Sequence, residues 1–148
     1  MIVIKPLLVK HFQDFIAHAR LSDFEEVKAA TGQLFQDLPA ADVVLGTRAI
    51  IREESGEVLG IGGLEHFGDR AAIWVMLTTH VEKHPIEFLR FSKKYLKDTI
   101  FRRYREVANY VHKDNRLHIK WLNWLGAEWL PFDHECLKLF VLSRGEDE

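Results

Sequence analysis

Cysteine is almost missing from this chain of 148 residues, in which Cys136 is the single one. One cysteine excludes an internal disulfide, and a fold without disulfides suits a reducing compartment. Cys136 lies between Glu135 and Leu137, and we interpret it as a half-buried packing residue, since free cysteines are commonly buried and inert. The sequence therefore predicts a cytoplasmic protein whose fold depends on its core.

Long apolar runs are absent as well. The sequence has no stretch of 18 apolar residues, which is the minimum for a membrane-spanning helix. The first six residues do not combine a charged segment with a long apolar one, so no secretory signal is expected. We expect no membrane partner.

An excess of charge of one sign is the third absence. The formal net charge is −2, whereas nucleic-acid-binding domains usually carry a basic excess, so a nucleic-acid partner is not expected. Basic residues do cluster between positions 90 and 105. We interpret this cluster as a solvated helix face, and contact with a phosphate or an acidic partner is the alternative.

What the chain has is a core and an ordered central unit. Hydrophobic residues make up 47% of the sequence, enough for one domain over residues 1–148. In the centre, a strand-like run at 71–77 precedes a helix at 86–103 that Pro85 opens. A second strand-like run at 107–111 precedes a helix that Asn115 caps and Gly126 ends. This order favours two parallel strands covered by helices.

The flanking segments complete a mixed α/β or α+β fold. Helices are expected at 11–20 and 22–30, with Ser22 and Glu25 as a capping box. Strands are expected at 2–5, 43–52, 58–67, 128–132 and 137–142, with a loop at 33–42. Three glycines inside the 58–67 strand, Gly60, Gly62 and Gly63, indicate a close backbone approach or a bulky neighbour such as Trp74. The expected sheet is mostly antiparallel, with six or seven strands and about four helices.

The central unit, with Asn115 opening the helix that ends at Gly126, resembles the GCN5-related N-acetyltransferase (GNAT) superfamily. The chain is similar to a degenerate member of it, like small phage-encoded acetyltransferase-like and internal virion proteins. The turn at 52–57 and the glycine-containing strand after it also match the superfamily. The resemblance implies a parallel strand pair that splays to form the cofactor cleft, and transfer of an acetyl group from acetyl-CoA to an amine acceptor.

The resemblance also implies a cofactor site. In the superfamily the first strand of the pair holds the pantetheine, and the next loop and helix start bind the pyrophosphate. The positions that correspond here are Met76, Leu77, Thr78, Thr79, His80, Lys83, His84 and Asn115.

The chemistry of this loop departs from the superfamily pattern. Both glycine places of the pyrophosphate loop are filled, by Lys83 and Pro85, and Glu82 adds a negative charge. Leu122 stands where the superfamily often has a proton-donating tyrosine. Two hypotheses therefore stay open: an N-acetyltransferase-like protein with an atypical loop, and a non-catalytic phage assembly or virion-associated protein on the same fold. Whether the chain is an enzyme is left open.

Candidate acid–base groups are few. Glu65, His112 and His118 lie near the ends of expected elements and could accept a proton. His80 and His84 are four apart, but Pro85 starts the helix after them and no third ligand is near in the sequence, so no metal is expected. The aromatic stripe of Phe88, Phe91 and Tyr95 either packs under other helices or contacts a protein partner or a second copy.

Overall fold

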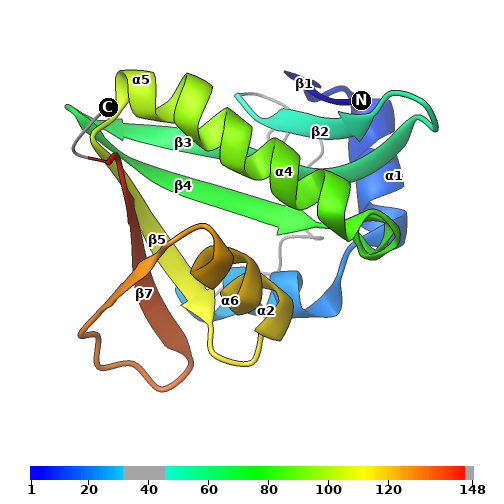
Figure 1. Cartoon of the computed structure of the whole chain (residues 1–148). Coiled ribbons are helices and arrows are strands. Elements are labelled where there is room, and N and C mark those ends of the chain that lie inside the picture. The colour runs from blue at the N-terminus through cyan, green and yellow to red at the C-terminus, as the bar shows by residue number, and fades with distance from the viewer. Residues whose placement is uncertain (32–45, 146–148) are drawn as a thin grey trace.

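The computed structural model describes residues 1–31 and 46–145. The loop expected at 33–42 and the first part of the strand expected at 43–52 lie outside the described residues. One seven-stranded sheet runs through the described chain in the order β1-β2-β3-β4-β5-β7-β6 (Figure 1). Its strands are β1 Ile2–Pro6, β2 Arg48–Arg52, β3 Glu57–Phe67, β4 Arg70–Leu77, β5 Glu106–His112, β6 Glu128–Leu130 and β7 Leu137–Ser143. The mixed, mostly antiparallel fold expected from the sequence is confirmed.

Helices cover both faces of the sheet. On one face, α1 (Val9–His18) buries Phe12 and Phe15 against β2 and β3. On the other face, α4 (Pro85–Tyr95) lies across β3 and β4 (Figure 1). It continues as η3 (Leu96–Ile100), which is a π-helical turn, and α5 (Phe101–Arg103), so the helix expected at 86–103 is present.

The remaining helices lie beside the centre of the sheet. They are α2 (Leu21–Thr31), the short η2 (Thr79–Lys83) and α6 (Arg116–Trp124). The helix α2 begins at Leu21, so Ser22 lies inside it and is not the expected N-cap. The cap of α6 is as expected: the Asn115 side chain accepts a hydrogen bond from the His118 backbone N–H, and Gly126 follows the helix with φ of 90°.

The parallel pair splays as expected. The strands β4 and β5 pair only from Arg70 opposite Glu106 to Ala72 opposite Ala108. Beyond that point the Asn109 side chain donates a hydrogen bond to the carbonyl of Ile73 at 2.7 Å, and the strands then separate. We call the space between the separated ends of β4 and β5 the splay; it is the part of the fold that the site below occupies.

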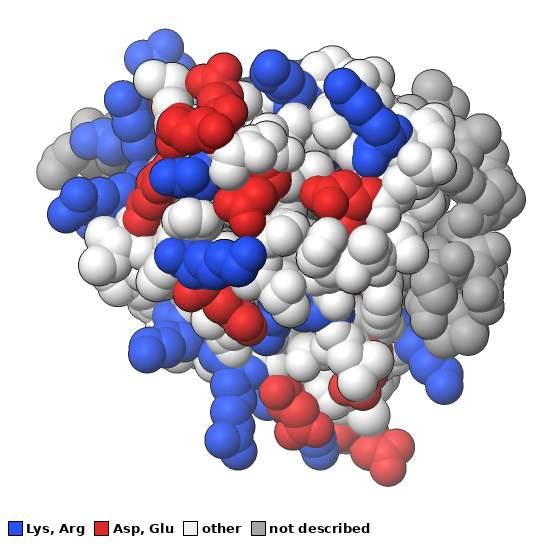
Figure 2. Space-filling view, turned by 90° about the vertical axis from the view of Figure 1, so that its right-hand side faces the viewer, with Lys and Arg blue, Asp and Glu red and all other residues white. Residues whose placement is uncertain are grey.

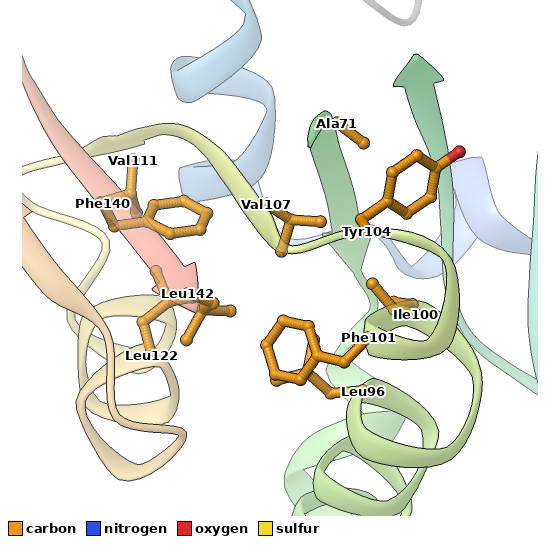
Figure 3. Close-up of a cluster of buried hydrophobic side chains, with 10 residues drawn as sticks. All are labelled: Ala71, Leu96, Ile100, Phe101, Tyr104, Val107, Val111, Leu122, Phe140 and Leu142. Carbon is orange, nitrogen blue, oxygen red and sulfur yellow. The ribbon is translucent and has the colours of Figure 1, made fainter. Parts of the chain in front are cut away.

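A hydrophobic cluster packs η3 and α5 against β5, β7 and α6 (Figure 3). It contains Leu122 of α6, Phe140 and Leu142 of β7, and Val107 and Val111 of β5. Leu122 is 4% exposed and packs as a core side chain. A leucine side chain offers no proton, so this position cannot supply one to a leaving thiolate.

The aromatic stripe expected on the long helix packs inward at Phe88. Phe88 is buried and its ring lies 5.4 Å from that of Trp121, so α6 covers it. Ile86, in the same first turn of α4, is 64% exposed. Trp124 is exposed beneath the Lys93 ammonium, 5.3 Å from its ring.

Charges on the surface do not separate by sign on the face drawn in Figure 2, where Lys and Arg are interspersed with Asp and Glu. Among the described residues, no helix is both long enough and apolar enough to cross a membrane.

Candidate functional site

The splay leaves backbone N–H groups of β4 and β5 without a strand partner, and such buried groups need acceptors. Two carboxyl groups of α2 supply them. Asp23 accepts a hydrogen bond from the N–H of Leu77 at the end of β4. Glu26 accepts one from the N–H of His112 at the end of β5, at 2.8 Å. One helix therefore bridges the two separated strand ends with its own side chains.

Asn115 and Arg20 join the two carboxyl groups into a network. The Asn115 amide donates to Asp23 and to Glu26, each at 3.0 Å. The Arg20 guanidinium donates to Asp23 at 3.0 Å and to the Asn115 side-chain oxygen at 3.2 Å. The Arg20 backbone N–H also donates to the carbonyl of Leu77, at 3.2 Å. Asp23 and Asn115 are fully buried. Asp23, Glu26 and His118 are among the polar residues that line a cavity of about 1080 Å³ along the separating strands.

His118 completes the network from α6. Its ring nitrogens lie 3.4 Å from carboxylate oxygens of Asp23 and of Glu26. Burial acts to lower the pKa of His118, but the hydrogen bond that its ring donates to Glu26 and the charges of both carboxylates outweigh it, so the pKa is raised. Burial raises the pKa of Asp23, against the opposing charge of His118 and the bond from Leu77. With His118 protonated, two negative and two positive groups balance, as a buried ionic cluster requires.

A second cluster surrounds Glu57 at the start of β3. Its carboxylate lies 2.9 Å from a ring nitrogen of His80, 3.2 Å from one of His84 and 3.4 Å from the Lys83 ammonium. The hydrogen bond from the Ser55 hydroxyl and those from His84 and Lys83 lower the pKa of Glu57 to about 2, against the effect of burial. His80, Lys83 and His84, in the segment after β4, therefore already share one carboxylate as their partner.

The remaining residues predicted for the cofactor lie between these two clusters. Met76, Leu77 and Thr78 are buried, and Thr79 is exposed. The Thr78 hydroxyl donates to the carbonyl of Val58 at 2.8 Å and accepts from the N–H of His80, so it caps η2.

The backbone of β4 and the loop after it do not fit an acyl-CoA. A pantetheine running along β4 needs free backbone groups of that strand, but the N–H of Leu77 already donates a hydrogen bond to Asp23. A pyrophosphate needs N–H donors and cations that are available to it. Here Pro85 has no N–H, and His80, Lys83 and His84 are held by Glu57. No chemical step through an acyl-CoA follows from this arrangement.

The three catalytic candidates are separated by the structure. His118 lies inside the buried network, and His112 borders it through its backbone N–H. Glu65 is exposed on the outer part of β3, opposite Ala72, and belongs to neither cluster. At that end of β3, His66 and the buried Tyr104 hydroxyl share a hydrogen bond.

Sequence reasoning missed the residues that close the splay. Arg20 was the last residue of the helix expected at 11–20, and Asp23 and Glu26 lay in the helix expected at 22–30, for which only a capping box was considered. A signal was present in the acidic pair Asp23 and Glu26, because i and i+3 positions share a helix face. That face is now known to meet β4 and β5.

Comparison with solved structures gives the fold. A GCN5-related N-acetyltransferase from Brucella melitensis superposes with a TM-score of 0.68 at 15% identity, covering 96% of this chain and 75% of that one. An acetyltransferase of the GNAT family from Bacillus anthracis gives 0.65 at 11% identity, with 99% and 96% covered. The PaiA N-acetyltransferase from Thermoplasma acidophilum, solved in complex with coenzyme A, gives 0.61 at 13% identity, with 97% and 99% covered. The chain therefore has the GNAT fold.

Comparison of sequences gives the family. A search of the curated proteins found no match. A family model described as bacteriophage T7, probable scaffold protein Gp13, matches residues 48–135, which is more than half of the chain. The chain therefore belongs to the bacteriophage T7 probable scaffold protein Gp13 family.

Proposed function

We propose that this chain is a non-catalytic phage assembly protein built on the GNAT fold, and that it does not use acyl-CoA. One observation carries the proposal: Asp23 and Glu26 take the backbone N–H groups of β4 and β5 within the splay. A ligand could reach those groups only by displacing two carboxylates from a buried network that also holds Arg20 and Asn115. Breaking such a network costs several kcal/mol, on the order of 3–5 for one buried pair.

The loop after β4 supports the same conclusion. The three side chains of this loop that were expected to hold a pyrophosphate, His80, Lys83 and His84, all contact Glu57, and Glu82 adds a negative charge to the loop. The missing proton donor at Leu122 is a further support, because that side chain is packed in the core. The family description, probable scaffold protein, fits a role in assembly. On this proposal the chain works in a host cytoplasm or with a virion.

Calorimetric titration with acetyl-CoA tests the first half of the proposal. We expect no heat of binding and no change in melting temperature at millimolar acetyl-CoA, with a coenzyme A-binding acetyltransferase as positive control. A saturable signal would contradict the proposal, because a ligand of the native state must raise the melting temperature. If Lys83→Glu then weakened that signal, the ligand would lie where the superfamily places it.

Infection by a T7-like phage that lacks its own member of this family tests the second half. A tagged chain supplied in the host should sediment with the particles and raise their yield. A chain that stays apart from the particles and leaves their yield unchanged would contradict the assembly role.

A further inference from the structure

Two histidines and an aspartate meet at the end of the sheet, outside the splay. Asp14 and His18 are four apart on α1, so they lie on one helix face. His80 reaches the same place from η2, with its ring centroid 4.3 Å from that of His18 and the planes tilted by 40°. One ligand atom from each of Asp14, His18 and His80 lies within 4.8 Å of the other two.

The hydrogen bonds of these histidines orient their rings. Nδ1 of His80 lies 2.9 Å from the Glu57 carboxylate. Nδ1 of His18 lies 3.0 Å from the backbone carbonyl of Asp14 and 3.2 Å from its carboxylate. A proton at Nδ1 leaves the lone pair at Nε2, and this pairing of an imidazole with a carboxylate or carbonyl is typical of histidines that bind a metal.

The aspartate is also held in place. The second carboxylate oxygen of Asp14 accepts a hydrogen bond from the N–H of Val58 at 3.3 Å. The His80 side chain is 11% exposed and the His18 side chain 41%, so the group is fixed on one side and open on the other. Such a site leaves room for a water molecule as a further ligand.

The buried network in the splay offers the same types of metal ligand as Asp14, His18 and His80, but its charges are balanced differently. Asp23, Glu26 and His118 also lie close enough together to hold an ion. There, however, the Arg20 guanidinium lies 3.0 Å from Asp23 and already supplies the positive charge. Cations are near this group too: the Lys83 ammonium lies 3.5 Å from Nδ1 of His80, and Lys5 and Lys10 line the same depression as Asp14. They lower the affinity expected for a metal ion by charge repulsion, but Lys83 is exposed and can turn away, whereas Arg20 is held inside the network.

We propose that Asp14, His18 and His80 bind one divalent transition-metal ion and so link α1 to the segment after β4. Two imidazoles and one carboxylate are a ligand set for Zn²⁺, with water in the fourth position. Glu57 acts behind His80 as a positioning residue. This inference does not depend on the proposed assembly role.

Titration of the whole chain with ZnCl₂ after removal of bound metal by EDTA tests the site. We expect one equivalent of Zn²⁺ to bind and to raise the melting temperature. MgCl₂ should have no effect, because Mg²⁺ prefers oxygen ligands. Co²⁺ in place of Zn²⁺ should give a visible absorption spectrum with histidine coordination. No binding of Zn²⁺ would overturn the proposal.

Variants locate the ion. His18→Ala is expected to fold, because that side chain is partly exposed, and to lose the shift in melting temperature with Zn²⁺. Asp14→Asn, which can still accept from Val58, serves as a second ligand variant. Glu57→Gln should weaken Zn²⁺ binding by about 10- to 100-fold without abolishing it.

The matched control is His134→Asn, in the exposed turn between β6 and β7. It should bind Zn²⁺ as the wild type does, since His134 is not among the three ligands. The same Zn²⁺ binding in the wild type, His18→Ala and Asp14→Asn would place the ion on other histidines and overturn the proposal.

Discussion

Replacing Asp23 by alanine removes the central acceptor of the splay. The change leaves the N–H of Leu77 without an acceptor in the interior and deprives Arg20 and His118 of a carboxylate. An orphaned buried donor costs about 1–3 kcal/mol, and breaking a buried ion pair about 3–5 kcal/mol. The two costs overlap, and Arg20 keeps its bond to Asn115, so we expect the free energy of unfolding to fall by about 3 kcal/mol.

Asp23→Asn separates the two parts of that loss. Asparagine keeps an oxygen that can accept from Leu77 but removes the charge, so a smaller loss of about 1–2 kcal/mol is expected. Glu25→Ala is the control, because Glu25 is exposed on the same helix and its loss should stay within about 0.5 kcal/mol.

Urea unfolding followed by tryptophan fluorescence and circular dichroism measures these values, with the same slope for all variants. The measurement is best made at pH 6, which is below the ordinary histidine pKa of 6.5. At that pH His118 is mostly charged in the unfolded chain, and because folding raises its pKa it is charged in the folded chain as well. A loss below about 1 kcal/mol for Asp23→Ala would refute the reasoning, because it would mean that the buried contacts of Asp23 do not hold the splay closed.

Two further predictions concern β3. Glu57→Gln should lower stability by about 1 kcal/mol above pH 4.5; because the folded-state pKa of Glu57 is lowered from 4.5 to about 2, its contribution is lost as the pH falls through that range. The stability curves of wild type and variant against pH should therefore converge in acid, and parallel curves would contradict the pairing of Glu57. Gly62→Ala should cost about 1–3 kcal/mol, because a Cβ there would lie 2.6 Å from the backbone carbonyl of Trp74. In Gly63→Ala the new Cβ would lie 2.7 Å from the Trp74 side chain, which can move, so this change should cost less than Gly62→Ala. Thermal unfolding in which Gly63→Ala is the more destabilising of the two would contradict this reasoning.

The glycines of β3 illustrate a choice that the sequence left open. A close backbone approach and a bulky neighbour were both possible reasons for them. The structure contains both: Gly60 and Gly62 face backbone carbonyls of β4, and Gly63 faces the indole of Trp74. Which glycine meets which atom depends on the β3–β4 register, in which Gly63 lies opposite Trp74. A strand pattern fixes the alternation of faces but not the register with its neighbour.

Asn115 also shows how far the sequence alone could go. Asn115 was identified as a helix cap and as a member of a cofactor site. Its capping role is confirmed by the bond from the His118 N–H. Its amide, however, donates to Asp23 and Glu26, and no local pattern could have identified those partners, since they lie on a distant helix.

The order of strands and helices was determined by the sequence itself, because apolar periodicity, Pro85, Asn115 and Gly126 act over a few residues each. The resemblance implied the splay, and the pairing of β4 and β5 does end after Ala72 and Ala108. Only the tertiary structure decided which polar side chains line it. Asp23 and Asn115 are 92 positions apart, and their meeting depends on how α2 packs against β5. Buried polar groups take whichever partner the packing brings within reach, so the polar lining of the splay was set by the fold as a whole.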